Sequence, residues 1–153
     1  MVAARLWLVT ARCSAVVLNE PALGSMWWPV RLLTDDREDE QIIALWLNST
    51  LGITALLQAS EETRGPWIQM KKNKLRTLPV LDPATLSARA RSFFLSTWAE
   101  VESETLAPVS TLARDSVRLR IDAAVTEGLG VPEDSIDALR RMLDSEPRIA
   151  SRE

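Results

Sequence analysis

A short basic segment in the middle of the chain holds the residues best suited to bind a polyanion. It contains Arg64, Lys71, Lys72, Lys74 and Arg76 and no acidic residue, in a chain whose net charge is only -3. A local group of cations on an otherwise acidic protein can bind phosphate at one place. Lysines at a helix start oppose the helix dipole, which favours a phosphate partner for them. Charge alone fits an exposed, hydrated basic turn equally well.

Two amide side chains lie within this basic segment. Gln69 and Asn73 each carry a paired donor and acceptor, the arrangement that reads the edge of an adenine. Because they are flanked by the lysines, we expect them to be the base-reading residues if the segment contacts DNA.

A second polar motif interrupts an apolar helical stretch. Asn48, Ser49 and Thr50 follow Ala44–Leu47, and Gly52 comes two residues later. Such side chains bond to nearby backbone and interrupt helices, while glycine permits a close approach. We therefore expect a kink or a cap between two helices, whose freed amides and polar side chains could in addition face a phosphate.

The composition excludes several classes of active site. The chain has one cysteine, Cys13, and no histidine, which excludes an internal disulfide, a multi-cysteine zinc site and histidine-based catalysis. There is also no glycine-rich cofactor loop and no phosphate-binding lysine loop. We expect no catalytic residue and no metal site on this chain.

Acidic residues in the C-terminal half have a simpler interpretation. Asp115, Arg118 and Asp122 are spaced three and four apart, so they share one helix face and predict surface ion pairs. Glu100, Glu102 and Glu104 predict a hydrated stretch.

The pattern of apolar residues predicts the elements that position these groups. We expect two short strands within 5–19 and a third over 26–33. Helices are expected over 42–47 and 51–61, with Asp39 or a neighbour as the first cap. A strand at 67–70, a helical turn at 71–76 and a short strand at 80–81 follow. Three more helices are predicted at 86–106, at 111–127 and from Pro132.

These elements predict an α+β fold with a small, mostly antiparallel or mixed sheet and a helical C-terminal extension. We divide the chain into an α+β unit at 1–83 and the extension at 84–153. No segment approaches the ~20 apolar residues of a membrane-spanning helix, so we expect no membrane partner and a cytoplasmic location.

Residues 44–82 resemble the target-recognition region of adenine-N6 DNA methyltransferases from restriction-modification and phage-defence systems. There an apolar helix ends in Asn-Ser, a glycine precedes a strand, and a Leu-x-x-Leu-Pro step closes the unit. The matching positions here are Asn48, Ser49, Gly65, Trp67 to Met70, Leu75, Leu78 and Pro79. The recognition domains of type I specificity subunits are similar. The tail also resembles the end of such proteins at Asp115, Arg118, Asp122, Ala124, Leu129-Gly130-Val131 and Glu146-Pro147.

The resemblance implies a part that reads double-stranded DNA and does no chemistry itself. The Asn/Asp-Pro-Pro-aromatic tetrapeptide of adenine methylation is absent, so S-adenosylmethionine would bind a partner methyltransferase domain or subunit. The chain would then be a fragment, a separate subunit or a split-gene remnant. Two alternatives remain open: a protein-interaction module that uses the tryptophans and the helical tail, and a truncated reading frame that does not fold or bind DNA.

Overall fold

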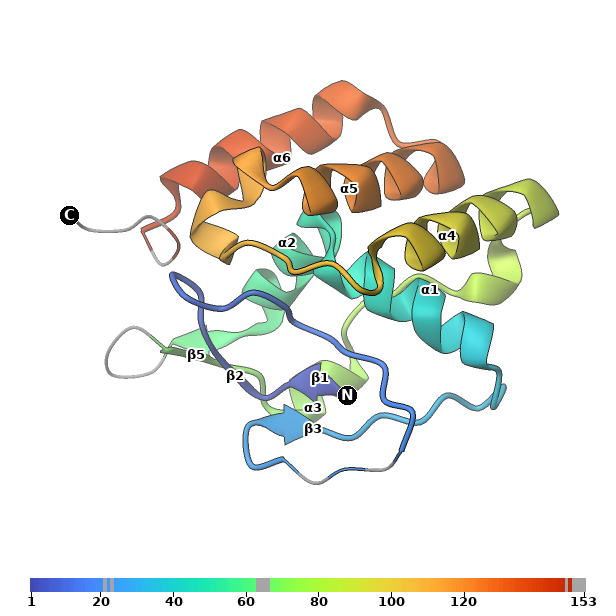
Figure 1. The fold of residues 1–153 in the computed structure, drawn as a ribbon. Coiled ribbons are helices and arrows are strands. Elements are labelled where there is room, and N and C mark those ends of the chain that lie inside the picture. Colours follow the sequence, from blue (N-terminus) through green and yellow to red (C-terminus); the bar gives the residue numbers. More distant parts are fainter. Residues whose placement is uncertain (21, 23, 63–66, 148, 150–153) are drawn as a thin grey trace.

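Two small antiparallel sheets lie on one side of the molecule and helices on the other (Figure 1). The structure is a computed structural model that describes all residues except 21, 23, 63–66, 148 and 150–153. In the first sheet β1 (Val2–Ala3) pairs with β3 (Trp27–Trp28). In the second, β5 (Trp67–Gln69) lies between β2 (Arg5–Trp7) and β4 (Glu61–Glu62). The α+β class and the small antiparallel sheet are confirmed.

The helices account for most of the remaining chain. They are α1 (Arg37–Asn48), α2 (Thr50–Ala59), α3 (Lys72–Arg76), α4 (Ala88–Val101), α5 (Ser116–Leu129) and α6 (Glu133–Ser145), with 3-10 turns η1 (Pro83–Thr85) and η2 (Val109–Arg114). The helical C-terminal half is confirmed.

Side-chain caps explain where several helices begin and end. Asp36, rather than Asp39, caps α1 by accepting a hydrogen bond from the amide of Glu38. Ser49 ends α1 and caps α2 through the amide of Gly52. Gly130 ends α5 with a positive φ of 63°, which glycine adopts without strain. The expected break between two helices at Asn48–Ser49 is confirmed.

Some expected elements are shorter or missing. Only Trp27 and Trp28 form the third strand, and Val80 and Leu81 lie outside any strand. Most of 8–19 is irregular. Ala15 forms only an isolated antiparallel bridge with Val2, and the side chain of Asn48 also bonds to Ser14 and Ala15. The start of the helix expected at 111–127 is the 3-10 turn η2, which is followed by Asp115 as the cap of α5.

The larger hydrophobic core joins both halves of the chain. Leu45 and Leu47 of α1 belong to the same cluster as Phe94 of α4 and Ile121 of α5. A second cluster packs the inner face of the second sheet, represented by Ile68, against residues of α2, η2 and α6. Both clusters fix the sheets against the helical layer.

No single helix among the described residues is long and apolar enough to span a membrane. The helices α1 and α2 taken together, with a bend of 76° between them, have the necessary length and composition.

Candidate nucleic-acid interface

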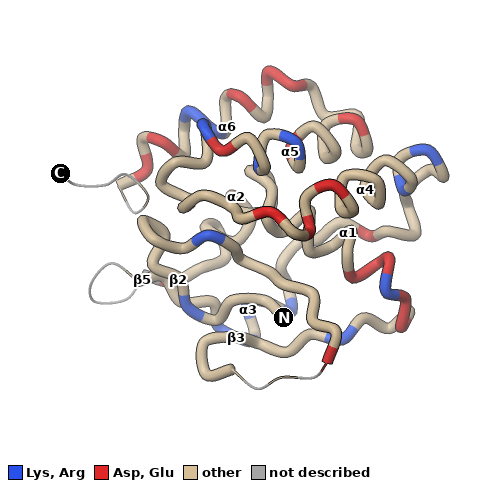
Figure 2. Tube along the Cα trace, viewed as in Figure 1, with Lys and Arg blue, Asp and Glu red and all other residues tan. Residues whose placement is uncertain are grey.

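The helix α3 presents its basic side chains to solvent. Lys71, Lys72, Lys74 and Arg76 are all exposed, and none of them faces an acid within the helix. Figure 2 shows basic residues on β2 and α3, on the side of the molecule away from α6. The short helix thus forms a basic projection, which we call the α3 surface (Lys71, Lys72, Asn73, Lys74 and Arg76).

One of these cations is already neutralised within the protein. The Lys71 ammonium lies 2.6 Å from a carboxylate oxygen of Glu61 on β4, and both side chains are about half exposed. Among the ion pairs of the described residues, none involves Lys72, Lys74 or Arg76. Three cations of the α3 surface therefore remain available to an external anion.

The cations of α3 are distributed over both of its ends. Lys71 occupies the N-cap position, where it makes no side-chain hydrogen bond to the helix, and the first turn has no acid. Lys74 and Arg76 lie in the last turn, where the helix dipole favours positive charge. The dipole therefore opposes only the cations at the start of α3, of which Lys71 is already paired with Glu61.

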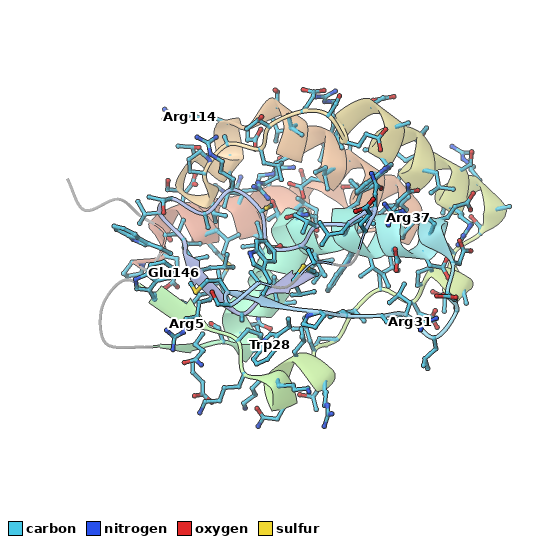
Figure 3. All side chains as sticks on the ribbon, turned by 60° about the horizontal axis from the view of Figure 1, so that its bottom comes forward. Arg5, Trp28, Arg31, Arg37, Arg114 and Glu146 are labelled. Carbon is cyan, nitrogen blue, oxygen red and sulfur yellow. The ribbon has the colours of Figure 1, made fainter. Side chains whose placement is uncertain are left out.

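Arg5 extends the basic surface onto the second sheet. Its strand β2 pairs with β5 so that Arg5 lies opposite Gln69, and its side chain is exposed. Figure 3 shows Arg5 projecting on the side of the molecule where α3 lies. Arg5 was not predicted as part of the site, because its strand pairing with Gln69 spans more than sixty positions.

The two candidate base-reading residues occupy different elements. Gln69 is half-buried in the middle strand of the second sheet, whereas Asn73 is exposed on α3 between two lysines. Arg64 and Gly65 lie outside the described residues, as does the rest of 63–66.

The Asn48 motif, in contrast, lies inside the protein. Asn48 is 7% exposed, and Ser49 and Thr50 are fully buried. The Asn48 oxygen accepts a hydrogen bond from the Ser14 amide at 2.8 Å, and its amide nitrogen donates to the Ala15 carbonyl at 2.8 Å. These contacts hold the N-terminal segment against the end of α1, so we assign the motif a structural role and no phosphate contact.

Gly52 has a steric role in the same motif. A Cβ at this position would lie 2.0 Å from the carbonyl oxygen of Trp46 and 2.7 Å from the Cα of Leu47. Because both are backbone atoms, only glycine lets α2 cross so close to α1. In the closing Leu-Pro step, Leu78 is buried in the larger core, so its role is structural. Pro79 is exposed.

The expected surface ladder of Asp115, Arg118 and Asp122 is wrong. Asp115 is 6% exposed, Asp122 1% and Arg118 not at all. Helical spacing correctly placed the three on one face, but that face packs against the N-terminal segment and the junction of α1 and α2. Glu100, Glu102 and Glu104 are exposed, as expected.

Asp122 joins two helices through buried hydrogen bonds. Its carboxylate accepts from the Thr50 amide at 2.7 Å and from the Thr50 hydroxyl at 2.6 Å, and Arg140 of α6 donates at 3.0 Å. The carboxylate thus lies at the N-terminus of α2, where the helix dipole favours negative charge.

Arg118 connects three backbone segments. Its guanidinium donates to the carbonyl of Asn48, to that of Arg12 at 2.9 Å and to that of Ala107 at 3.5 Å. Burial lowers the pKa of Arg118, while the charges of Asp115 and Asp122 oppose that shift. Arg118, Asp115 and Asp122 therefore hold the N-terminal segment and the junction of α1 and α2 against α5, and their side chains are too buried to contact a ligand.

The described residues contain no group of three or more His, Cys, Asp or Glu side chains placed to hold a metal ion. Burial raises the pKa of the Cys13 thiol, which disfavours the nucleophilic thiolate.

No family model, curated protein or solved structure matches this chain.

Proposed function

We propose that this chain is a DNA target-recognition (specificity) fragment or subunit of an adenine-N6 methyltransferase or restriction-modification system. It acts in the cytoplasm, carries no catalytic site, and serves a partner domain or subunit that binds S-adenosylmethionine. The observation that supports the proposal best is the set of three exposed cations, Lys72, Lys74 and Arg76, that have no ion pair among the described residues.

These cations suit a duplex backbone for a physical reason. Double-stranded DNA carries a negative charge about every 1.7 Å along its axis, and each neutralised phosphate releases counterions. Lys72, Lys74 and Arg76 lie on one short helix, so a single approach of the duplex can engage more than one of them. Lys71 contributes less, because Glu61 already compensates its charge.

Phosphate contacts hold the DNA and base contacts select the sequence. In this proposal Asn73, which stands exposed between Lys72 and Lys74, reads a base edge beside the held phosphates. Gln69 contributes from the adjoining strand.

The test is the salt dependence of duplex binding. We expect the affinity of the purified chain for mixed-sequence duplex to fall with salt. Lys72 and Arg76 are four residues apart on α3 and share a face, so Lys72→Glu/Arg76→Glu should reduce the slope of log affinity against log salt by about two, roughly one for each phosphate contact.

Arg114→Glu/Arg141→Glu is the matched control. It makes the same change in net charge at two exposed arginines of the helical half, neither of which has an ion pair among the described residues. We expect it to leave the slope nearly unchanged. Equal losses in both variants would mean that net charge, rather than the α3 surface, controls binding, and would refute the proposal.

One observation favours the alternative, a protein-interaction module. A hollow of about 550 Å³ lies between the N-terminal segment, the residues after β3 and α1, and apolar residues such as Val17, Leu32 and Ile43 line it. Leu33 nearby is fully exposed. If the chain binds duplex only when a methyltransferase partner is co-expressed, the protein-interaction module is favoured over direct DNA recognition by this chain.

A further inference from the structure

The outward face of the second sheet carries an exposed pair of tryptophans. Trp7 on β2 lies opposite Trp67 on β5, with ring centroids 6.1 Å apart and the planes tilted by 45°. The two side chains are 38% and 39% exposed. On the other face of the same strands, Leu6 and Ile68 belong to the second hydrophobic cluster. The aromatic pair is therefore on the solvent side of a sheet that is already anchored.

Polar and basic groups adjoin this pair on the same face. Residues directly opposite each other on paired strands share a face, so Arg5 and Gln69 stand beside the tryptophans, one alternation along the strands. Glu61 of β4 is opposite Gln69 and forms its ion pair with Lys71. Arg5 and Gln69 therefore lie on this face between the aromatic pair and the Glu61–Lys71 ion pair, which adjoins the rest of the α3 surface.

The distance between these two features fits a short stretch of nucleic acid. Lys71 comes four positions after Trp67, and extended chain advances about 3.3 Å per residue, so the two positions lie at most about 13 Å apart along the strand. A strand of DNA lying across this face would reach both the rings and the cations.

We propose that the tryptophan platform (Trp7, Trp67, Arg5 and Gln69) binds unpaired DNA bases by stacking, next to a duplex held by the α3 surface. This inference rests on the proposed function and names its substrate class: DNA in which a few bases are unpaired beside double-stranded DNA.

Two physical arguments select this occupant. Every base has an aromatic face, and stacking on tryptophan is tolerant of sequence, but in a duplex neighbouring bases already cover those faces. Only unpaired bases can use the platform. The positive charge of Arg5 and of the α3 surface also complements a phosphate backbone, whereas an apolar protein segment would gain nothing from these cations.

The experiment compares two DNAs with the same protein. One is a blunt duplex, and the other is the same duplex with a short unpaired overhang. We expect the intact chain to bind the overhang DNA more tightly. Because stacking does not release counterions, the ratio of the two affinities should persist as salt rises, although both affinities fall.

Variants locate the preference on the platform. Trp67→Ala should weaken overhang binding by roughly 5- to 150-fold for one lost stacked base, and should bring it close to blunt-duplex binding. Trp67→Phe should retain most of the preference, because a smaller ring still stacks. Phe93→Ala is the control, since Phe93 of α4 is an aromatic residue with the same 38% exposure on the helical half; it should change neither affinity.

The outcomes distinguish the two proposals. Salt-dependent binding of both DNAs with no preference in the intact chain would overturn the platform and leave the proposed function standing. Absence of binding to either DNA would overturn both. A preference that Trp67→Ala and Phe93→Ala leave equally intact would also overturn the platform. The comparison of two DNAs with the unaltered protein needs no variant, so a folding defect in Trp67→Ala cannot obscure the result.

Discussion

Removal of the Asp122 carboxylate is the most direct test of the buried scaffold. Asp122→Ala deletes the acceptor of the Thr50 amide and hydroxyl and of the Arg140 guanidinium. Thr50 is fully buried and Arg140 is 12% exposed, so water can compensate little of the loss at Thr50. The N-terminus of α2 would lose both its counter-charge and a hydrogen-bond acceptor.

The expected cost follows from these contacts. A hydrogen bond to a charged group contributes about 1.5–3 kcal/mol, and removing one partner of a buried ion pair costs about 3–5 kcal/mol. The contacts share one carboxylate and are not additive, so we expect a loss of about 4 kcal/mol in the free energy of unfolding. At roughly 2–4 °C per kcal/mol for a chain of this size, the melting temperature should fall by about 8–16 °C.

Urea denaturation followed by circular dichroism measures this loss. A cooperative transition in the unaltered chain would also show that the chain folds, and so would exclude the alternative of a truncated reading frame that does not fold. Asp144→Ala is the control, because Asp144 is exposed on α6 and has no ion pair among the described residues. Its free energy of unfolding should change by no more than about 0.5 kcal/mol.

A second variant distinguishes loss of the contact between Thr50 and Asp122 from general destabilisation of the fold. Thr50→Val keeps the side-chain shape and removes the hydroxyl, at a cost of about 1–2 kcal/mol. In the Asp122→Ala background the same change should cost much less, because the partner is already gone. A loss below about 1 kcal/mol for Asp122→Ala, or equal costs of Thr50→Val in both backgrounds, would refute the scaffold role of Asp122.

Three further predictions follow from neighbouring contacts. Gly52→Ala should destabilise the protein by about 3 kcal/mol or more in urea denaturation, because its Cβ would meet the backbone carbonyl of Trp46 at 2.0 Å; a neutral result would contradict the close crossing of α1 and α2. Asn48→Ala should cost about 2–4 kcal/mol and speed proteolysis of the N-terminal segment, because the buried amide and carbonyl groups that it bonds are left unpaired. The hydrogen bond from Arg91 holds the pKa of Asp39 below its usual value. Asp39 therefore adds stability above pH ~4, and this stability disappears as the pH falls through the lowered pKa. Asp39→Asn should reduce the stability of the protein at pH 7 and flatten the loss of stability in acid; an unchanged acid profile would refute the role of Asp39.

Much of the secondary structure was predictable because its causes are local. The apolar periodicity of α1 and α2, the break at Ser49 and the αL cap at Gly130 depend on residues within a few positions of one another. The same holds for α3, where basic residues follow a short strand. Strand lengths were less predictable, since pairing partners such as Arg5 and Gln69 lie far apart in the chain.

The polar motifs show where local reasoning fails. Asp115, Arg118 and Asp122 fit an exposed helix face by type and spacing, yet they are buried. Asp122 accepts from Thr50 and Arg118 donates to Asn48, partners some seventy positions away, while Asp115 accepts from the nearer amide of Ala107. A polar side chain is exposed by default only when no distant partner compensates its burial.

Residue types and short-range spacing were enough to predict an α+β protein with a helical half, to exclude histidine chemistry and an internal disulfide, and to locate the segment that concentrates positive charge. The chain carries these properties in any conformation. Which charges face the solvent, in contrast, depends on the tertiary fold. It paired Lys71 with Glu61, left Lys72, Lys74 and Arg76 exposed, brought the two tryptophan-bearing strands together and buried the Asn48 motif, because each of these outcomes requires groups distant in the chain to meet.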